Sequence, residues 1–260
     1  MNIIDLSKRA WRTTLERKPL WLFAMFMGAL NASLSVSGSA SERLPLVGIL
    51  AVGVLVTLLA FAARVLGETA LIRGVHRGEM GWLWQESRRL FRPVALIHLG
   101  AGFAGFSVWL TMMSPLLLIP LVNAPIALVL ALLIPLLALG IPVALTLTFL
   151  HAYALRFAVL EDASATEAWT EAGRYLRGRV LESIYVALLA SIGRSLLQIA
   201  LVVFVLPALL AGGATYLLFG VIPGLVVVAL LSLPVALASE ALAEVFASSM
   251  WTHAFLRGRG

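Results

Sequence analysis

APIALVLALLIPLLALGIPVALTLTF, at residues 124–149, is a continuous run of apolar, small and hydroxyl-bearing residues that contains no charged side chain. An α-helix needs about 20 apolar residues to cross the hydrocarbon core of a bilayer, so this segment is long enough to span a membrane. Inside lipid, every backbone N–H and C=O must find its partner within the protein, and a helix provides those partners locally. The segment therefore predicts a transmembrane helix.

Five further apolar stretches of similar length flank this segment on both sides. They run over residues 19–38, 45–66, 93–119, 184–211 and 215–239. The connections that follow the odd-numbered stretches are short, at residues 39–43, 120–123 and 212–214. The chain is therefore predicted to be all-α, a polytopic bundle of six transmembrane helices built as three helical hairpins.

Composition supports a membrane protein and excludes several other classes. Apolar residues make up 61% of the 260 residues and charged residues only 12%, about half the usual share of roughly 25% in soluble domains. The mean hydropathy is +1.00. The chain has no cysteine, which excludes a disulfide framework, a thiolate metal site and a cysteine nucleophile.

Basic residues are distributed asymmetrically between the two sides of the predicted bundle. Of the 19 lysines and arginines, all but Arg43 and Arg194 flank the spans on one side, which the positive-inside rule assigns to the cytoplasm. We therefore expect a multi-pass protein of the cytoplasmic membrane with both termini in the cytoplasm. The same distribution explains the net charge of +6 without nucleic-acid binding, which we do not expect.

The predicted integral membrane domain, residues 1–260, resembles three copies of one unit, at about 1–76, 77–160 and 161–260. In each copy, an amphipathic segment with a tryptophan leads into a span; these are Trp11, Trp84 and Trp169. Tryptophan prefers the headgroup layer, so we expect interfacial anchors on cytoplasmic amphipathic helices. The recurrence favours a retained N-terminus over a signal peptide cleaved near residues 37–40; chance similarity between amphipathic segments is the alternative to a repeat.

The third lead-in segment carries the clearest local signals. Ser164 followed by Glu167 is a capping box that predicts a helix beginning at Ala165 and ending near Arg177. Glu171 and Arg174 are spaced to pair on its surface. Its apolar positions fall on one face; they are Ala165, Ala168, Trp169, Ala172 and Leu176.

Two patterns concern packing within the bundle. Helical character continues beyond the inward spans, through residues 69–75, 155–160 and 241–256, so these helices should project past the membrane. Gly220 and Gly224 form a GxxxG pair, which permits close helix approach. Internal packing is favoured over dimerisation, and the sequence does not fix an oligomeric state.

Short stretches in the second half of the chain are similar to a family signature. They are LRFAVLED at 155–162, EAW at 167–169 and RYLRG at 174–178, with Trp11 and LWL at 20–22 fitting the same pattern. The signature resembles that of bacterial six-span membrane proteins of unknown function, including the membrane domain associated with glycerophosphodiester phosphodiesterases. The resemblance implies a six-helix membrane bundle. It does not imply the phosphodiesterase activity, which belongs to a separate soluble barrel.

Motifs for catalysis and cofactor binding are missing from the sequence. The two lysines, Lys8 and Lys18, do not follow a glycine-rich phosphate loop. The four histidines share no metal-ligand spacing, and no G-x-S-x-G elbow is present. We therefore expect no enzyme activity, no metal and no cofactor, with an intramembrane enzyme assembled from distant helices as the remaining catalytic alternative.

Charged residues within or beside the spans are the candidate functional residues. Arg194 lies in the fifth span, Glu240 and Glu244 follow the sixth, and Arg64 and Glu68 form a second polar cluster after the second span. Intramembrane charges usually pair inside a bundle and mark either function or helix register. Arg194 lies about ten residues into its span, roughly 15 Å at about 1.5 Å per residue. We nevertheless predict that it pairs with Glu240, or failing that with Glu244.

Two functions agree with these observations. The first is a non-catalytic scaffold or accessory subunit whose partners are the lipid bilayer and other membrane proteins. The second is a small-solute transporter or channel that uses the intramembrane Arg and Glu residues. A polar cavity open to one side would favour transport, whereas a packed bundle with an apolar lateral groove would favour the scaffold.

Overall fold

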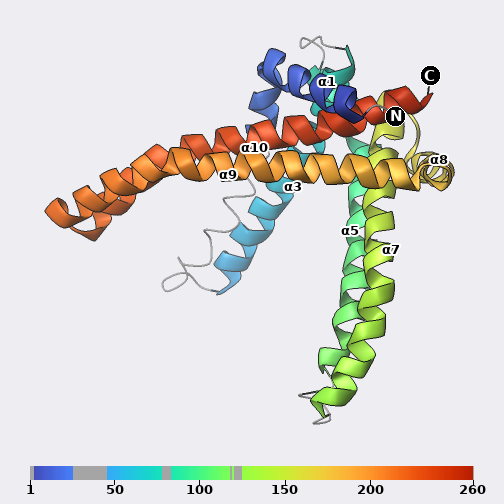
Figure 1. The fold of residues 1–260 in the computed structure, drawn as a ribbon, viewed down its shortest axis with the longest axis horizontal. Helices are drawn as coiled ribbons and strands as arrows, with labels where there is room; N and C mark the ends of the chain where they lie inside the picture. Colours follow the sequence, from blue (N-terminus) through green and yellow to red (C-terminus); the bar gives the residue numbers. More distant parts are fainter. Residues whose placement is uncertain (1–2, 26–45, 78–82, 118, 120–124, 260) are drawn as a thin grey trace. The chain divides into compact units, whose positions relative to one another are not determined.

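The computed structural model describes residues 3–25, 46–77, 83–117, 119 and 125–259 (Figure 1). Every regular element in these ranges is helical, so the predicted all-α class is confirmed. In chain order, the elements are α1 (Ile3–Glu16), helical residues 19–25, α3 (Leu46–Arg77), α4 (Leu83–Arg89), α5 (Phe91–Met113), the 3-10 turn η2 (Ser114–Leu117), α7 (Ile126–Leu160), α8 (Ala165–Arg177), α9 (Val180–Phe219) and α10 (Val221–Arg259).

Five helices in the described part of the chain are long and apolar enough to cross a membrane. They are α3, α5 with its 3-10 extension to Leu117, α7, α9 and α10. The first predicted span, 19–38, begins in the helical residues 19–25, and its remainder lies outside the described residues, as do the predicted turns at 39–43 and 120–123. The chain therefore has the character of a multi-pass membrane protein.

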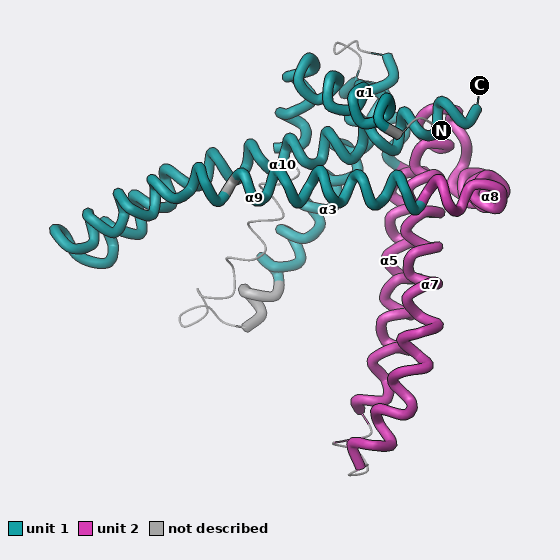
Figure 2. Tube along the Cα trace, viewed as in Figure 1, with its two compact units in different colours: residues 1–91, 184–260 teal, residues 92–183 magenta. Residues whose placement is uncertain are grey.

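The chain divides into two compact units (Figure 2). Unit 1 consists of Met1–Phe91 with Ile184–Gly260, and unit 2 consists of Arg92–Ser183. The boundary near Ser183 falls inside α9, so the first turn of that helix belongs to unit 2 and the rest to unit 1.

Unit 2 is an antiparallel helical hairpin of α5 and α7 that carries α8 (Figure 1). Near the beginning of α5, His98 Nδ1 lies 3.2 Å from His151 Nε2 of α7. Near the other end of the hairpin, the Met112 side chain packs over Gly140. Because one contact joins early α5 to late α7 and the other late α5 to middle α7, the two helices run in opposite directions.

Unit 1 is held together by two apolar clusters. In the first, Leu20 and Ala24 pack with residues of α3, α4 and α10, including Leu71 and Val245. In the second, Leu6 and Ala10 of α1 pack with α9 and α10. Arg17 adds a polar tie, because its guanidinium donates hydrogen bonds to the carbonyl oxygens of Gly74 and Val75.

The turn between the last two spans differs from the prediction. The expected turn at 212–214 is wrong, because α9 continues through these residues to Phe219 and the chain reverses at Gly220, whose φ is +95°. Glycine adopts this left-handed conformation readily, and a helix in lipid keeps its backbone hydrogen bonds. Gly212 instead brings two helices close, since a Cβ there would lie 3.0 Å from the carbonyl oxygen of Gly224. Of the predicted GxxxG pair, Gly224 is confirmed as an internal packing position, whereas Gly220 lies at the reversal with open space around it.

The predicted extensions of the inward spans are confirmed. Helix α3 continues to Arg77, α7 to Leu160 and α10 to Arg259. At 39 residues, α10 is about 58 Å long at about 1.5 Å per residue, far longer than the hydrocarbon core of about 30 Å. A large part of α10 must therefore lie outside the lipid tails in any upright orientation.

Candidate functional site

Arg194 of α9 bridges two glutamates of α10. Its Nη2 donates to Glu240 Oε1, and its Nη1 lies 2.9 Å from Glu244 Oε1. Glu240 and Glu244 are one helical turn apart, so their carboxylates lie on the same face of α10. The planar guanidinium presents several N–H groups in a fork and can serve both carboxylates at once. The structure thus brings together the three residues that the sequence proposed.

The Arg194 cluster is only partly covered by protein. About a third of each side chain is accessible, with 40% exposed for Arg194, 34% for Glu240 and 32% for Glu244. Their charges are therefore screened less than at a surface and more than in a core.

The second polar cluster joins the first. Arg64 and Glu68 of α3 interact electrostatically with Glu244, and α3 packs against α10. The sequence alone predicts two separate clusters, because no signal near these residues in the chain shows which spans become neighbours. We call the five residues Arg64, Glu68, Arg194, Glu240 and Glu244 the charge cluster.

The composition of the charge cluster suits helix assembly more than metal binding. It contains three carboxylates and two guanidiniums contributed by α3, α9 and α10. Removing one partner leaves the others unpaired in a medium that solvates them poorly, so the cluster favours one arrangement of the three helices. Across the described residues, no group of three or more His, Asp or Glu is placed to hold a metal ion.

The three tryptophans predicted as interfacial anchors have different surroundings. Trp11 is exposed and meets Phe246 edge to face, with ring centroids 5.8 Å apart. Trp84 is exposed and carries the Arg88 guanidinium over its ring at 5.3 Å. Trp169 is half-buried. Exposed rings beside cationic groups fit a headgroup layer.

Helix α8 begins and ends as the sequence predicts. Ser164 is its N-cap, the Ser164 hydroxyl accepts from the Glu167 N–H, and Glu167 accepts from the Ser164 N–H at 3.0 Å. The Ser164 hydroxyl also donates to Glu167 Oε2 at 2.7 Å. This hydrogen bond, and after it the one from the Ser164 N–H, holds the pKa of the Glu167 carboxyl below its usual value. The predicted pair is also present, with Arg174 Nη1 2.6 Å from Glu171 Oε1.

One face of α8 is buried and the other is exposed. The buried positions are Ala168, Ala172 and Leu176, and α8 packs on α7 of the same unit. Two other positions of the predicted apolar face, Ala165 and Trp169, are half-buried. The opposite face, which includes Thr166, Thr170 and Arg174, is exposed.

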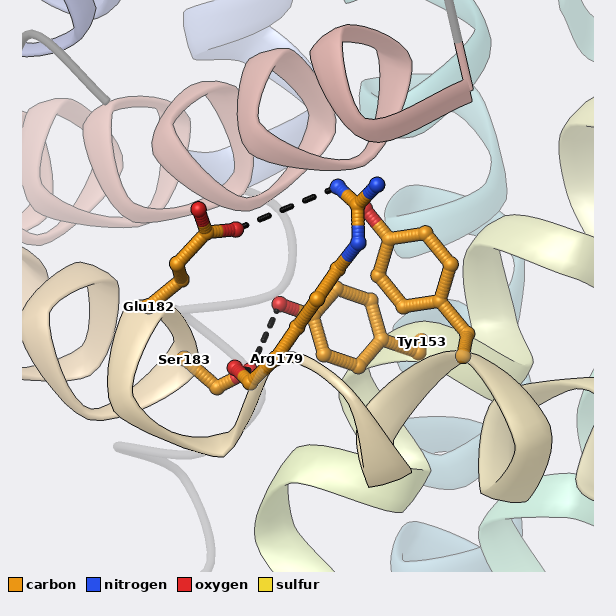
Figure 3. A network of polar contacts seen from close by, with 5 residues as sticks. Tyr153, Arg179, Glu182 and Ser183 are labelled. Atoms are coloured by element: carbon orange, nitrogen blue, oxygen red, sulfur yellow. Dashed lines mark hydrogen bonds and ion pairs between the residues drawn. The ribbon is translucent and has the colours of Figure 1, made fainter.

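A polar network at the junction of α7, α8 and α9 was not foreseen from the sequence (Figure 3). Tyr153 OH and Ser183 Oγ lie 2.9 Å apart and are buried. Arg179 lies over the Tyr175 ring at 4.8 Å and within 3.9 Å of Glu182. Burial raises the pKa of the Tyr175 phenol, so this group is a neutral partner for Arg179.

The network explains part of the family-like signature. Tyr175 lies inside the RYLRG stretch and packs against Tyr153, with ring centroids 4.8 Å apart. The Tyr175 ring of this stretch therefore helps to hold α8 against α7. The only sequence signal for this contact was Tyr175 itself, an aromatic residue in an otherwise polar and basic segment.

Comparisons with protein-family models, with curated proteins and with solved structures find no match to this chain. The class of the protein rests on its own architecture, an all-α chain with several membrane-length apolar helices. The resemblance to six-span membrane proteins stays a prediction.

Proposed function

We propose that this chain is a non-catalytic scaffold or accessory subunit of the cytoplasmic membrane, with six spans and both termini in the cytoplasm. The observation that carries the proposal is α8, a capped helix with one face packed on its own unit and the other exposed in the described part of the chain. A rigid helix at a membrane surface can bind a partner without paying to fold first. The charge cluster, in which Arg194 is paired with Glu240 and Glu244, would serve assembly.

The exposed ion pair of α8 provides a direct test of docking. Exchanging the two charges, Glu171→Arg with Arg174→Glu, keeps an i,i+3 pair while reversing the charge pattern of the exposed face. Affinity purification in mild detergent, followed by mass spectrometry, should show a membrane protein that co-purifies with the native chain and is lost from the exchanged variant.

The matched control is the exposed pair Arg12 and Glu16 of α1, whose atoms are 3.9 Å apart. Arg12→Glu with Glu16→Arg should retain the partner, because α1 belongs to the other unit. If both exchanges lose the partner equally, or neither does, docking through α8 is wrong.

The proposed orientation has its own test. Reporter fusions at Gly260 and within residues 120–123 should report opposite sides of the membrane, because the basic residues assign the C-terminus to the cytoplasm. Reports from the same side would contradict the six-span topology.

Transport of a small solute is the second candidate, and the charge cluster is the observation that favours it. The cluster contains three carboxylates and two guanidiniums from three different helices, and about a third of the Arg194, Glu240 and Glu244 side chains is accessible. Transporters place such groups on substrate and proton pathways. Proteoliposomes loaded with a pH-sensitive dye would reveal a proton flux that Glu244→Gln abolishes; equal flux in both variants would count against transport.

A further inference from the structure

An apolar groove runs between α1, α9 and α10 of unit 1. It has a volume of about 510 Å³ and is lined by Ser7, Lys8, Trp11, Gly193, Leu196, Leu197 and Phe246. This volume lies within the range of about 300–1,000 Å³ that small-molecule sites occupy. The groove is open along its side, so a ligand can enter it laterally.

The walls of the groove are apolar and its polar groups gather on α1. Phe246 packs over Gly193, where the missing side chain makes room for the ring. Leu196 and Leu197 extend the apolar wall along α9, and Trp11 closes it from α1. Ser7 and Lys8, consecutive on α1, are the polar residues of the lining. This division suits an amphiphile with an apolar tail and a polar head.

The positive charge of Lys8 at the polar end of the groove favours an amphiphile with an anionic head group. Lys8 is exposed, and no ion pair joins it to any residue that the structure describes. Arg194, although next to Gly193 in the chain, is already paired with Glu240 and Glu244. Lys8 is therefore the cation available to a ligand, and an ammonium group attracts phosphate.

The outer face of α1 has the composition of a helix at a membrane surface. Ile4 and Leu15 are exposed apolar residues of α1, and Lys8 and Arg12 lie between them in the sequence. Such a helix lies in the interface with its apolar side chains in lipid and its cations among head groups. A lipid beside α1 would meet Lys8 at phosphate depth and the groove at acyl-chain depth.

We infer that this groove binds one anionic phospholipid, with an acyl chain along Leu196, Leu197 and Phe246 and the phosphate at Lys8 and Ser7. This lipid site is separate from the proposed docking role, since α8 belongs to the other unit. Evidence against the lipid site would not contradict docking through α8, and evidence against docking would not contradict the lipid site.

The first test uses the full chain in nanodiscs of phosphatidylglycerol and phosphatidylcholine, in which one of the two lipids carries bromine on its acyl chains. Bromine quenches tryptophan on contact, and the difference between the native chain and Trp11→Phe isolates the Trp11 signal. Brominated phosphatidylglycerol should quench Trp11 more than brominated phosphatidylcholine at the same mole fraction. Equal quenching by the two lipids would overturn the inference.

Two charge variants separate a site from general surface attraction. Lys8→Gln should lower the preference for phosphatidylglycerol roughly tenfold or more, because it removes a charge-assisted hydrogen bond to the phosphate. Arg9→Gln, the neighbouring exposed cation that does not line the groove, should lower it by no more than about fivefold, the general effect of one cation near an anionic membrane surface. Equal effects of the two variants would mean that the net charge of α1, and not a site, attracts the lipid.

The apolar half of the site is tested by filling it. Leu197→Trp should remove the phospholipid that native mass spectrometry finds on the purified chain, whereas Val203→Trp, at an exposed position of the same helix outside the groove, should retain it. Retention in both variants, or a polypeptide in place of the lipid, would overturn the inference. Should Leu197→Trp fail to fold, the Lys8 and Trp11 measurements still decide.

Discussion

Replacing Arg194 by Leu should destabilise the protein by about 2 kcal/mol. The change removes both ion-pair contacts and leaves Glu240 and Glu244 facing each other across one helical turn. Breaking a buried pair costs about 3–5 kcal/mol, and we reduce that figure to about 2 kcal/mol because a third or more of each side chain is exposed. The ratio of folded to unfolded protein should fall about 30-fold.

The assay is equilibrium unfolding in mixed micelles, with helix content followed by circular dichroism. Arg174→Leu of α8 is the matched control, because it makes the same chemical change to an arginine that also contacts a glutamate, at 2.6 Å. The Arg174 side chain is 68% exposed, and exposed pairs contribute about 0.2–1 kcal/mol. The two variants therefore differ mainly in how well solvent replaces the lost partner.

A rescue experiment separates the ion pair from simple packing. Adding Glu240→Gln and Glu244→Gln to the Arg194→Leu chain removes the stranded charges and should restore at least half of the lost stability. The reasoning is refuted if Arg194→Leu costs no more than Arg174→Leu, or if neutralising the glutamates brings no recovery.

Three further changes test the α8 cap and the α9–α10 hairpin. Ser164→Ala should cost about 1 kcal/mol of helix stability and speed hydrogen exchange in the first turn of α8. The pKa of the Glu167 carboxyl is depressed in the folded state. The stabilisation by its hydrogen bonds to Ser164 is therefore complete above the usual carboxyl pKa of about 4.3 and is lost as the pH falls through the lower pKa of the folded state. Hydrogen exchange of α8 in acid should show this loss. Gly212→Val should destabilise the hairpin by about 1–3 kcal/mol through overpacking, whereas Gly213→Val, with open space around it, should cost less in thermal unfolding.

The features predicted correctly from the sequence are those that depend on nearby residues. The α8 cap needs only Ser164 and Glu167, three positions apart, and the extensions of the inward spans need only unbroken helical periodicity. The apolar spans are equally local, because each must satisfy its own backbone in lipid. The buried face of α8 follows from the same spacing of Ala168 and Ala172.

The features that the sequence did not reveal depend on which helices become neighbours. The contact of Tyr153 with Ser183 joins α7 to the start of α9, and nothing near either residue specifies the other. The same holds for Glu68 and Glu244, which influence each other electrostatically only because α3 packs on α10. Hydropathy identifies spans, but it is nearly uniform around each apolar helix and so does not show which face meets a neighbour.

The error in the predicted hairpin turn and the contact made by Arg194 have one explanation. With a turn at residues 212–214, Arg194 would lie about 19 residues before the reversal and Glu240 about 27 after it, an offset of about 12 Å at about 1.5 Å per residue. The reversal is instead at Gly220, which lies 26 residues after Arg194 and 24 before Glu244. These distances nearly match, so the guanidinium reaches Glu244 directly and Glu240 one turn away. The position of one left-handed glycine therefore sets the register of the hairpin, and the register places the charges opposite one another.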